Sequence, residues 1–279
     1  MVPPGIIMQG LLQMNSDRFK KIIEYNKSHS EEITEEIRDF YSNVGISSGE
    51  NILRLDQIAR EEFAKRKFVM IELPLKDKEI GAMAYKGDFW GYVFINSSLP
   101  KVTVNFALCH EFYHVFSHPD SFRNTVELFM EEKYYDDENE KKANSFAGTL
   151  LMPENSFRKM FELFRNNSKG DVEIICKLMN YYESPYMATV VRCYELGLFD
   201  NDSDRVKKLI NTKKNEIRSM FDEKWLDDKI LKETGNDQFE RLMVMVDRFG
   251  EIEVSSGRLK ENSLKKVKAN LSRIYKELV

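Results

Sequence analysis

The sequence lacks the features that mark secreted or membrane-spanning proteins. Its three cysteines are odd in number and scattered, so they offer neither a disulfide framework nor a CxxC metal site. The short apolar stretch at the N-terminus is broken by polar residues and glycine, and no lysine or arginine precedes it. It therefore resembles neither a signal peptide nor a membrane span. These absences predict a cytoplasmic protein.

The chain also lacks a basic surplus. Its formal net charge is −4, whereas a nonspecific nucleic-acid binder normally needs an excess of lysine and arginine. Hydrophobic residues make up 42% and aromatic residues 12% of the sequence, which predicts a packed core rather than disorder. The 279 residues suffice for one large domain or for a core domain with helical additions.

Hydrophobic periodicity predicts an α+β, mostly helical fold. Residues 14–66 have helical spacing, but 68–75 resembles a strand, and Pro74 favours a position at the sheet edge. Residues 80–96 predict two further strands around a turn, so we expect a small antiparallel sheet. Helices are expected over 100–117 and 138–153, with more helices after them.

This pattern divides the chain into three expected regions: an N-terminal helical region (1–50), a core domain (51–200) and a charged, helical C-terminal region (201–279). An apolar stripe at helical spacing runs along the last segment. Packing of this stripe on its own domain is favoured, and self-association or a partner surface is the alternative. The stripe consists of Leu264, Val267, Leu271, Ile274 and Leu278.

Histidine is scarce, yet three of the four histidines lie between residues 110 and 118. His110, Glu111 and His114 form an HExxH motif in an expected helix. Residues four apart nearly share a helix face, so the two imidazoles can hold one Zn²⁺. Glu111 is placed to accept a proton from an attacking water as general base. The alternative is a pair of ordinary histidines on a structural helix.

A catalytic zinc site needs a third protein ligand. His118 lies about 12 Å along the axis from His110, too far for one straight helix to offer all three imidazoles, and an interaction with the last helix carbonyls is favoured for it. Glu140 is the preferred third ligand because it lies at the edge of the apolar side of the second helix. Asp136, Asp137 and Glu138 remain rivals.

Other candidates surround this motif. A donor for the developing oxyanion is expected from tyrosine or arginine, and hydrogen-bond partners are expected for the histidines. For Arg192, a structural hydrogen bond or ion pair is favoured over a catalytic role. Cys109 is expected to pack in the core rather than to take part in the site. The candidate donors are Tyr113, Tyr186 and Arg192, and the candidate histidine partners are Asn144 and Asp120.

Four segments of the sequence share one resemblance: the strand "VFIN", "FALCHEFYHVFSH", the block from Glu140 to Pro153, and "ESPYMATVVRCYELGLF". Together they resemble the ImmA/IrrE family of zinc metallopeptidases over about residues 50–200. The resemblance implies His110, His114 and Glu140 as zinc ligands and Glu111 as general base. It also implies a gluzincin-like, zincin-type fold in which an edge strand aligns the substrate. The bulky Phe112 and Tyr113 depart from the small residues common between the family's histidines.

The resemblance implies an endopeptidase that cleaves a helix-turn-helix repressor and so relieves repression of mobile-element or stress genes. The alternative is a non-catalytic regulator, a DNA- or protein-binding module on a protease-like scaffold, with residues 184–198 as the DNA-reading segment. Only Arg192 is basic there, and the acidic net charge disfavours direct nucleic-acid binding. A protease with a host target, exported without a cleaved signal, is a further possibility.

Overall fold

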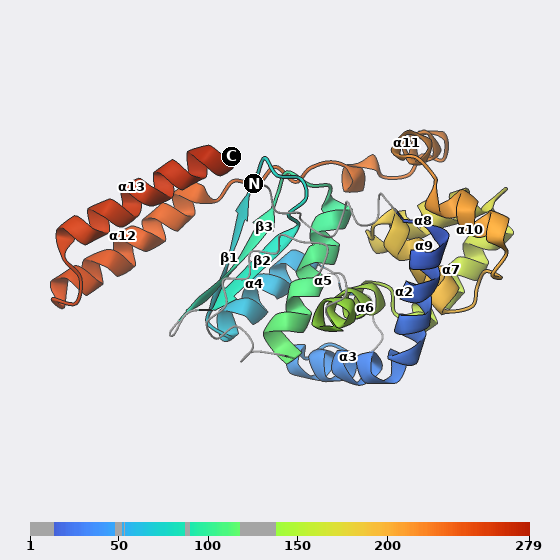
Figure 1. Ribbon diagram of the computed structural model, residues 1–279, viewed down its shortest axis with the longest axis horizontal. Coiled ribbons are helices and arrows are strands. Elements are labelled where there is room, and N and C mark those ends of the chain that lie inside the picture. Colours follow the sequence, from blue (N-terminus) through green and yellow to red (C-terminus); the bar gives the residue numbers. More distant parts are fainter. Residues whose placement is uncertain (1–13, 48–51, 53, 87–89, 118–137) are drawn as a thin grey trace.

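The computed structural model describes residues 14–47, 52, 54–86, 90–117 and 138–279 (Figure 1). Helices dominate this part of the chain, around one three-stranded sheet, which confirms the α+β, mostly helical class. No helix in the described residues is long and apolar enough to cross a membrane. The first three helices of the described residues are α2 (Ser16–Ser28), α3 (Ser30–Val44) and α4 (Leu55–Lys65).

Local sequence signals set the ends of these helices. The Asn15 side chain accepts a hydrogen bond from the Arg18 amide at 2.9 Å and caps α2. Gly45 ends α3 in the left-handed region at φ 71°, as its position in the sequence predicts. His29 is the N-cap of α3 and makes no side-chain capping hydrogen bond.

The sheet is mixed, which corrects the expectation of an antiparallel sheet. Its strands are β1 (Phe68–Leu73), β2 (Ala82–Lys86) and β3 (Gly91–Asn96), in the order β1-β3-β2. The consecutive strands β2 and β3 pair antiparallel, but β3 lies between β2 and β1 and therefore pairs parallel with β1. The edge position that Pro74 favours for the first strand is confirmed.

Asn96, at the end of β3, explains this order. The connection from β1 to β2 must cross the end of β3, and the buried Asn96 amide binds it there. Its oxygen accepts from the Leu75 amide at 3.1 Å, and its nitrogen donates to the carbonyls of Asp77 and Ile80 at 2.7 and 2.8 Å. Three backbone groups of the crossover are thus satisfied by one side chain.

The two faces of the sheet bury different partners. Val93 and Ile95 point into the main core, beside α4 and the central helix α5 (Lys101–Ser117). On the opposite face, Ile71 and Leu73 form a second small core with the base of a C-terminal helical hairpin. This hairpin consists of α12 (Phe239–Ser255) and α13 (Glu261–Leu278), and its tip projects away from the body (Figure 1).

The apolar stripe of α13 is divided between two environments. Leu264 is buried against Gly250 of α12, where a Cβ would lie 2.2 Å from a Leu264 methyl carbon. Val267, Ile274 and Leu278 are exposed. Part of the stripe therefore packs on its own hairpin, as favoured from the sequence, and part faces solvent.

The segment before α12 closes the outer edge of β1. The Gln238 amide donates to the Glu72 carbonyl at 2.9 Å, and its side-chain oxygen accepts from the Glu72 amide at 3.2 Å. The buried Glu72 carboxylate also binds Arg60 of α4 and accepts from Asn236 at 2.7 Å. These contacts tie the C-terminal region to the core domain.

The remaining helices form a cluster beside α2, on the far side of α6 from the sheet (Figure 1). Glu173 of α8 is its main polar anchor. Burial alone would raise the pKa of Glu173, but hydrogen bonds from Lys177, the Lys169 amide and Lys224 outweigh burial and lower it to about 2. The helices of this cluster are α7 (Glu154–Asn166), α8 (Asp171–Tyr182), α9 (Tyr186–Glu195), α10 (Ser203–Ile210) and α11 (Lys214–Glu223). Helix α6 (Glu138–Leu151) packs against both α5 and α9, and the 3₁₀ turn η2 (Asp228–Leu231) packs against α5.

Candidate metal centre

The HExxH motif lies in α5, a helix that is buried on almost every side. It packs between the sheet and α4 on one side and α6 on the other (Figure 1). This surrounding explains why its sequence is apolar around its whole circumference rather than on one stripe. His110 and His114 therefore occupy a rigid element, and both face α6.

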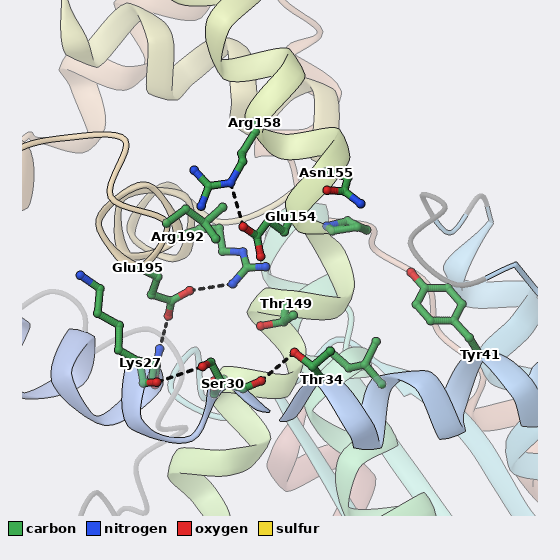
Figure 2. A pocket seen from close by; sticks show the side chains of 15 residues that line it. Lys27, Ser30, Thr34, Tyr41, Thr149, Glu154, Asn155, Arg158, Arg192 and Glu195 are labelled. Atoms are coloured by element: carbon green, nitrogen blue, oxygen red, sulfur yellow. Dashed lines mark hydrogen bonds and ion pairs between the residues drawn. The ribbon is translucent and has the colours of Figure 1, made fainter. Parts of the chain in front are cut away.

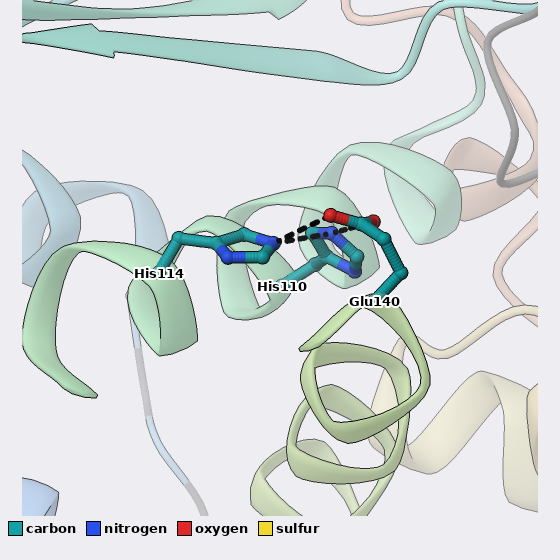
Figure 3. Close-up of side chains that lie close together, drawn as sticks. All are labelled: His110, His114 and Glu140. Atoms are coloured by element: carbon teal, nitrogen blue, oxygen red, sulfur yellow. Dashed lines mark hydrogen bonds and ion pairs between the residues drawn. The ribbon is translucent and has the colours of Figure 1, made fainter. Parts of the chain in front are cut away.

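Three side chains from these two helices converge (Figure 3). The Nε2 atom of His110 lies 3.1 Å from one Glu140 oxygen, and the Nε2 atom of His114 lies 3.2 Å from the other. The two Nε2 atoms are 3.1 Å apart. A tetrahedral metal with donor distances of about 2.0–2.1 Å separates its neighbouring ligands by about 3.3 Å. The three side chains can therefore hold one metal ion.

The hydrogen bond on the far side of His110 fixes its tautomer. Nδ1 of His110 lies 3.1 Å from the side-chain oxygen of Asn144, one turn after Glu140 on α6. An amide oxygen only accepts, so Nδ1 carries the hydrogen and neutral His110 presents a lone pair at Nε2. Metal-binding histidines are commonly oriented in this way. Asn144 is thus the histidine partner that the sequence suggested.

The surroundings of the three donors favour a positive charge. Burial alone would lower the pKa of the His110 imidazole, but Glu140 and Glu111 outweigh it and raise that pKa above its ordinary value. Burial alone would raise the pKa of Glu140, but the two histidines hold it well below the usual range of a carboxyl. An ionised Glu140 with two imidazoles is a suitable ligand set for a divalent cation.

Glu111 has a different environment from Glu140. Its side chain is buried, with 6% of the residue exposed, and no group in the described part of the chain donates a hydrogen bond to its carboxylate. Burial raises the pKa of Glu111, and the nearby histidines oppose that rise. Buried carboxylates without partners are rare in folded proteins. This one is available to a water molecule or substrate beside the three donors.

The bulky residues inside the motif pack into the aromatic core. Phe112 lies about 200° around α5 from His110, and its ring packs against Phe40 of α3 and Phe63 of α4 at centroid distances of 4.9 and 5.1 Å. The Tyr113 ring packs on Phe146 of α6 at 5.7 Å. Both side chains are fully buried, so they fill the aromatic core rather than the space over the histidines.

The three candidate oxyanion donors lie in different places. Tyr113 is fully buried in the aromatic core, and burial raises its pKa, which keeps it protonated. The Tyr186 hydroxyl donates to Thr212 at 3.0 Å. Arg192 donates to the Met152 carbonyl and to Glu195, both at 3.1 Å. Neither of these two contacts the histidine pair within the described residues.

The sequence did not indicate the contacts that hold the start of α6. The Tyr25 hydroxyl donates to Glu138 at 2.7 Å, and Nε2 of His29 lies 3.3 Å from the same carboxylate. Glu138, a rival for the third ligand, is therefore turned toward α2 and α3. The other rivals, Asp136 and Asp137, lie outside the described residues, as do Asp120 and His118.

The segment suggested as a DNA-reading element is part of the core. Helix α9 (Tyr186–Glu195) buries eight of its ten residues. A recognition helix must present its side chains to a groove, so this helix does not serve that role in the described fold. The structure therefore removes the feature on which the DNA-binding alternative rested.

Comparison with known proteins adds one finding. Residues 63–194 match a protein-family profile described as the IrrE N-terminal-like domain, of the peptidase family M78. The matched region begins near the end of α4 and includes the sheet, all three converging side chains and most of α9. Neither the curated proteins nor the solved structures give a significant match.

Proposed function

Residues 63–194 make this chain a member of the ImmA/IrrE family of peptidases, and on that premise we propose that it is a zinc-dependent endopeptidase. The observation that carries the proposal is the convergence of His110, His114 and Glu140 beside the buried Glu111 carboxylate, to which no group among the described residues donates a hydrogen bond. Two imidazoles, one carboxylate and an open fourth position are the usual ligand set of a catalytic zinc.

Each residue of the site has a distinct role in peptide hydrolysis. Zinc held by the three donors would supply Lewis acidity to the scissile carbonyl and make a water molecule more acidic. Glu111 accepts the proton of the attacking water and passes it to the leaving amine. Asn144 keeps the His110 ring oriented through Nδ1. Tyr113 is the candidate hydroxyl donor for the oxyanion that lies beside the site, with its ring 5.6 Å from that of His114.

The sheet offers one edge for an extended substrate. The edge of β1 is covered by Gln238, whereas backbone groups of 82–85 in β2 bond only within the sheet among the described residues. β2 also packs against α5, the helix that carries the motif. A substrate strand that pairs with β2 would gain main-chain hydrogen bonds and lie alongside the metal-binding helix.

We propose a helix-turn-helix repressor as the substrate and the cytoplasm as the location. Both follow from the family resemblance, and the absence of a basic surplus is compatible with a protein substrate rather than with direct nucleic-acid binding. Cleavage of the repressor would relieve repression of the genes under its control.

The ligand set is tested by elemental mass spectrometry on the purified full chain. We expect about one zinc per chain in the wild type and in Glu138→Ala, and a sharp fall in Glu140→Ala. Glu138→Ala is a matched control because Glu138 lies on the same helix but its carboxylate faces away from the donors. A wild type that takes up no zinc, even when zinc is supplied, refutes the proposal.

Catalysis is tested with repressors encoded beside the gene, each purified and incubated with the zinc-loaded chain. Glu111→Gln should lower the cleavage rate about 10²–10⁴-fold while zinc content stays unchanged. Glu240→Gln, an exposed change on α12, should leave the rate unchanged. Equal rates in the Glu111 variant and the wild type would remove Glu111 from the mechanism.

A further inference from the structure

The side of α6 that faces away from the three converging donors lines a cavity. This cavity of about 390 Å³ opens between the α2–α3 corner and the helices α6, α7 and α9 (Figure 2). Pockets for small molecules begin at about 300 Å³. Ser145 and Thr149 of α6 line this cavity, and they lie about 140° and 180° around the helix axis from Glu140.

Several polar side chains in this cavity have no partner. The hydroxyl of Ser145 makes no hydrogen bond within the described residues, although only 6% of this residue is exposed. The Thr149 hydroxyl, on a half-buried residue, and the exposed Asn155 amide of α7 also make no hydrogen bond within the described residues. Buried polar groups are normally hydrogen-bonded, so the Ser145 hydroxyl on the cavity wall favours a polar occupant.

The charges around the cavity favour an anion. Glu195 is already occupied, because one of its oxygens accepts from Arg192 and the other from Asn26. Lys27, in the last turn of α2, has no ion pair in the part of the chain that the structure describes. One cationic side chain therefore remains uncompensated at the cavity.

The wall formed by α7 adds to this positive character. Glu154, at the start of α7, pairs with Arg158 at 2.8 Å, but both side chains are about half exposed. Such a pair contributes about 0–1 kcal/mol and opens readily. Pro153 provides no side-chain cap for the first amides of this 13-residue helix. The positive end of the helix dipole therefore faces the cavity.

We propose that this cavity binds a small molecule that carries a phosphate or carboxylate group. Lys27, Arg158 and the first turn of α7 hold the anionic group. The polar remainder of the molecule accepts and donates hydrogen bonds with Ser145, Thr149 and Asn155. The cavity volume admits a metabolite rather than a peptide segment or a nucleic acid.

Occupation of the cavity would regulate the metal centre, an extension that rests on the proposed function. Helix α6 carries Glu140 and Asn144 on one side and the cavity residues Ser145 and Thr149 on the other. Because both sets of side chains share this helix, a ligand that shifts the position of α6 would change the affinity for the metal, and the metal would change the affinity for the ligand reciprocally.

The binding step is tested by isothermal titration calorimetry on the full, zinc-loaded chain, with inorganic phosphate and succinate as probes. We expect at least one probe to bind saturably, and its identity tells phosphate from carboxylate. Lys27→Gln should weaken binding about tenfold or more because a charged partner is lost. Lys20→Gln, an exposed change on the same helix, should change it less than about twofold.

Two results would overturn the proposal: no saturable binding of either probe, or equal weakening in the two lysine variants. A zinc dissociation constant that changes less than about fivefold at saturating probe would refute the coupling alone. The outcome is separable from the peptidase proposal. Probe binding that depends on Lys27 would support the cavity proposal even if no repressor is cleaved. Conversely, a failure of both probes to bind would not change the results for zinc content and cleavage.

Discussion

Replacement of Asn144 by alanine tests the orientation of the metal ligands without removing a ligand. Asn144 supplies the acceptor, at 3.1 Å, for Nδ1–H of His110, whose side chain is 7% exposed. Without it, a buried donor loses its partner at a cost of about 1–3 kcal/mol. Loss of such a partner typically weakens metal binding about 10–100-fold. We expect the zinc dissociation constant of Asn144→Ala to rise within that range.

The measurement is a competition titration against a chromophoric chelator at fixed pH and ionic strength. Asn144→Asp provides the informative partner variant, because a carboxylate accepts the same hydrogen bond more strongly and should keep or tighten zinc binding. Asn139→Ala, an exposed change on the same helix, controls for effects on α6 itself. Wild-type affinity in Asn144→Ala, or equal losses in the alanine and aspartate variants, would refute the orienting role.

Three further changes test the packing of the fold by equilibrium unfolding in urea. Glu173→Gln should destabilise the protein by about 1–3 kcal/mol at neutral pH. Because the pKa of Glu173 is lowered to about 2, its stabilisation is present above the ordinary pKa of 4.5, and the difference from wild type should shrink as the pH falls from 4.5 toward 2. A difference in stability that does not depend on pH would contradict this reasoning. Gly91→Ala should destabilise the protein by about 1–3 kcal/mol because the added Cβ would lie 2.5 Å from the Phe68 ring. Gly148→Ala, within a helix and with open space around the added Cβ, should stabilise it by about 0.5–1 kcal/mol. Equal effects of the two substitutions would count against this packing. Phe112→Ala should cost about 3–5 kcal/mol while zinc stoichiometry is kept, and loss of zinc from protein that is still folded would show that Phe112 reaches the site.

The sequence predicts helices and strands here better than it predicts the order of the strands. Gly45 and the helical spacing of residues 14–66 are local signals, and the structure agrees with them. The order β1-β3-β2 depends on Asn96, which binds a loop up to 21 residues earlier in the chain. No periodicity reveals such a contact, so the parallel pair was missed.

The candidate site shows the same division. His110, Glu111 and His114 lie within one helical turn, so their shared location follows from helix geometry alone. Glu140 comes from another helix, and composition did not separate it from its acidic neighbours. The structure separates it from Glu138, which α2 and α3 hold through Tyr25 and His29. Such contacts span more than a hundred residues and have no local signature.

The covered edge of β1 has a consequence for what the proposed enzyme recognises. Because Gln238 bonds the β1 edge at Glu72, β2 is the edge that the described residues leave open to a substrate. An edge strand reads main-chain amides and carbonyls, and a folded helix has already used these groups in its own hydrogen bonds. If the substrate pairs with β2, its local conformation, more than its sequence, determines whether it is cleaved. A repressor then becomes vulnerable where a linker is extended or a helix has melted, and its folded form is spared.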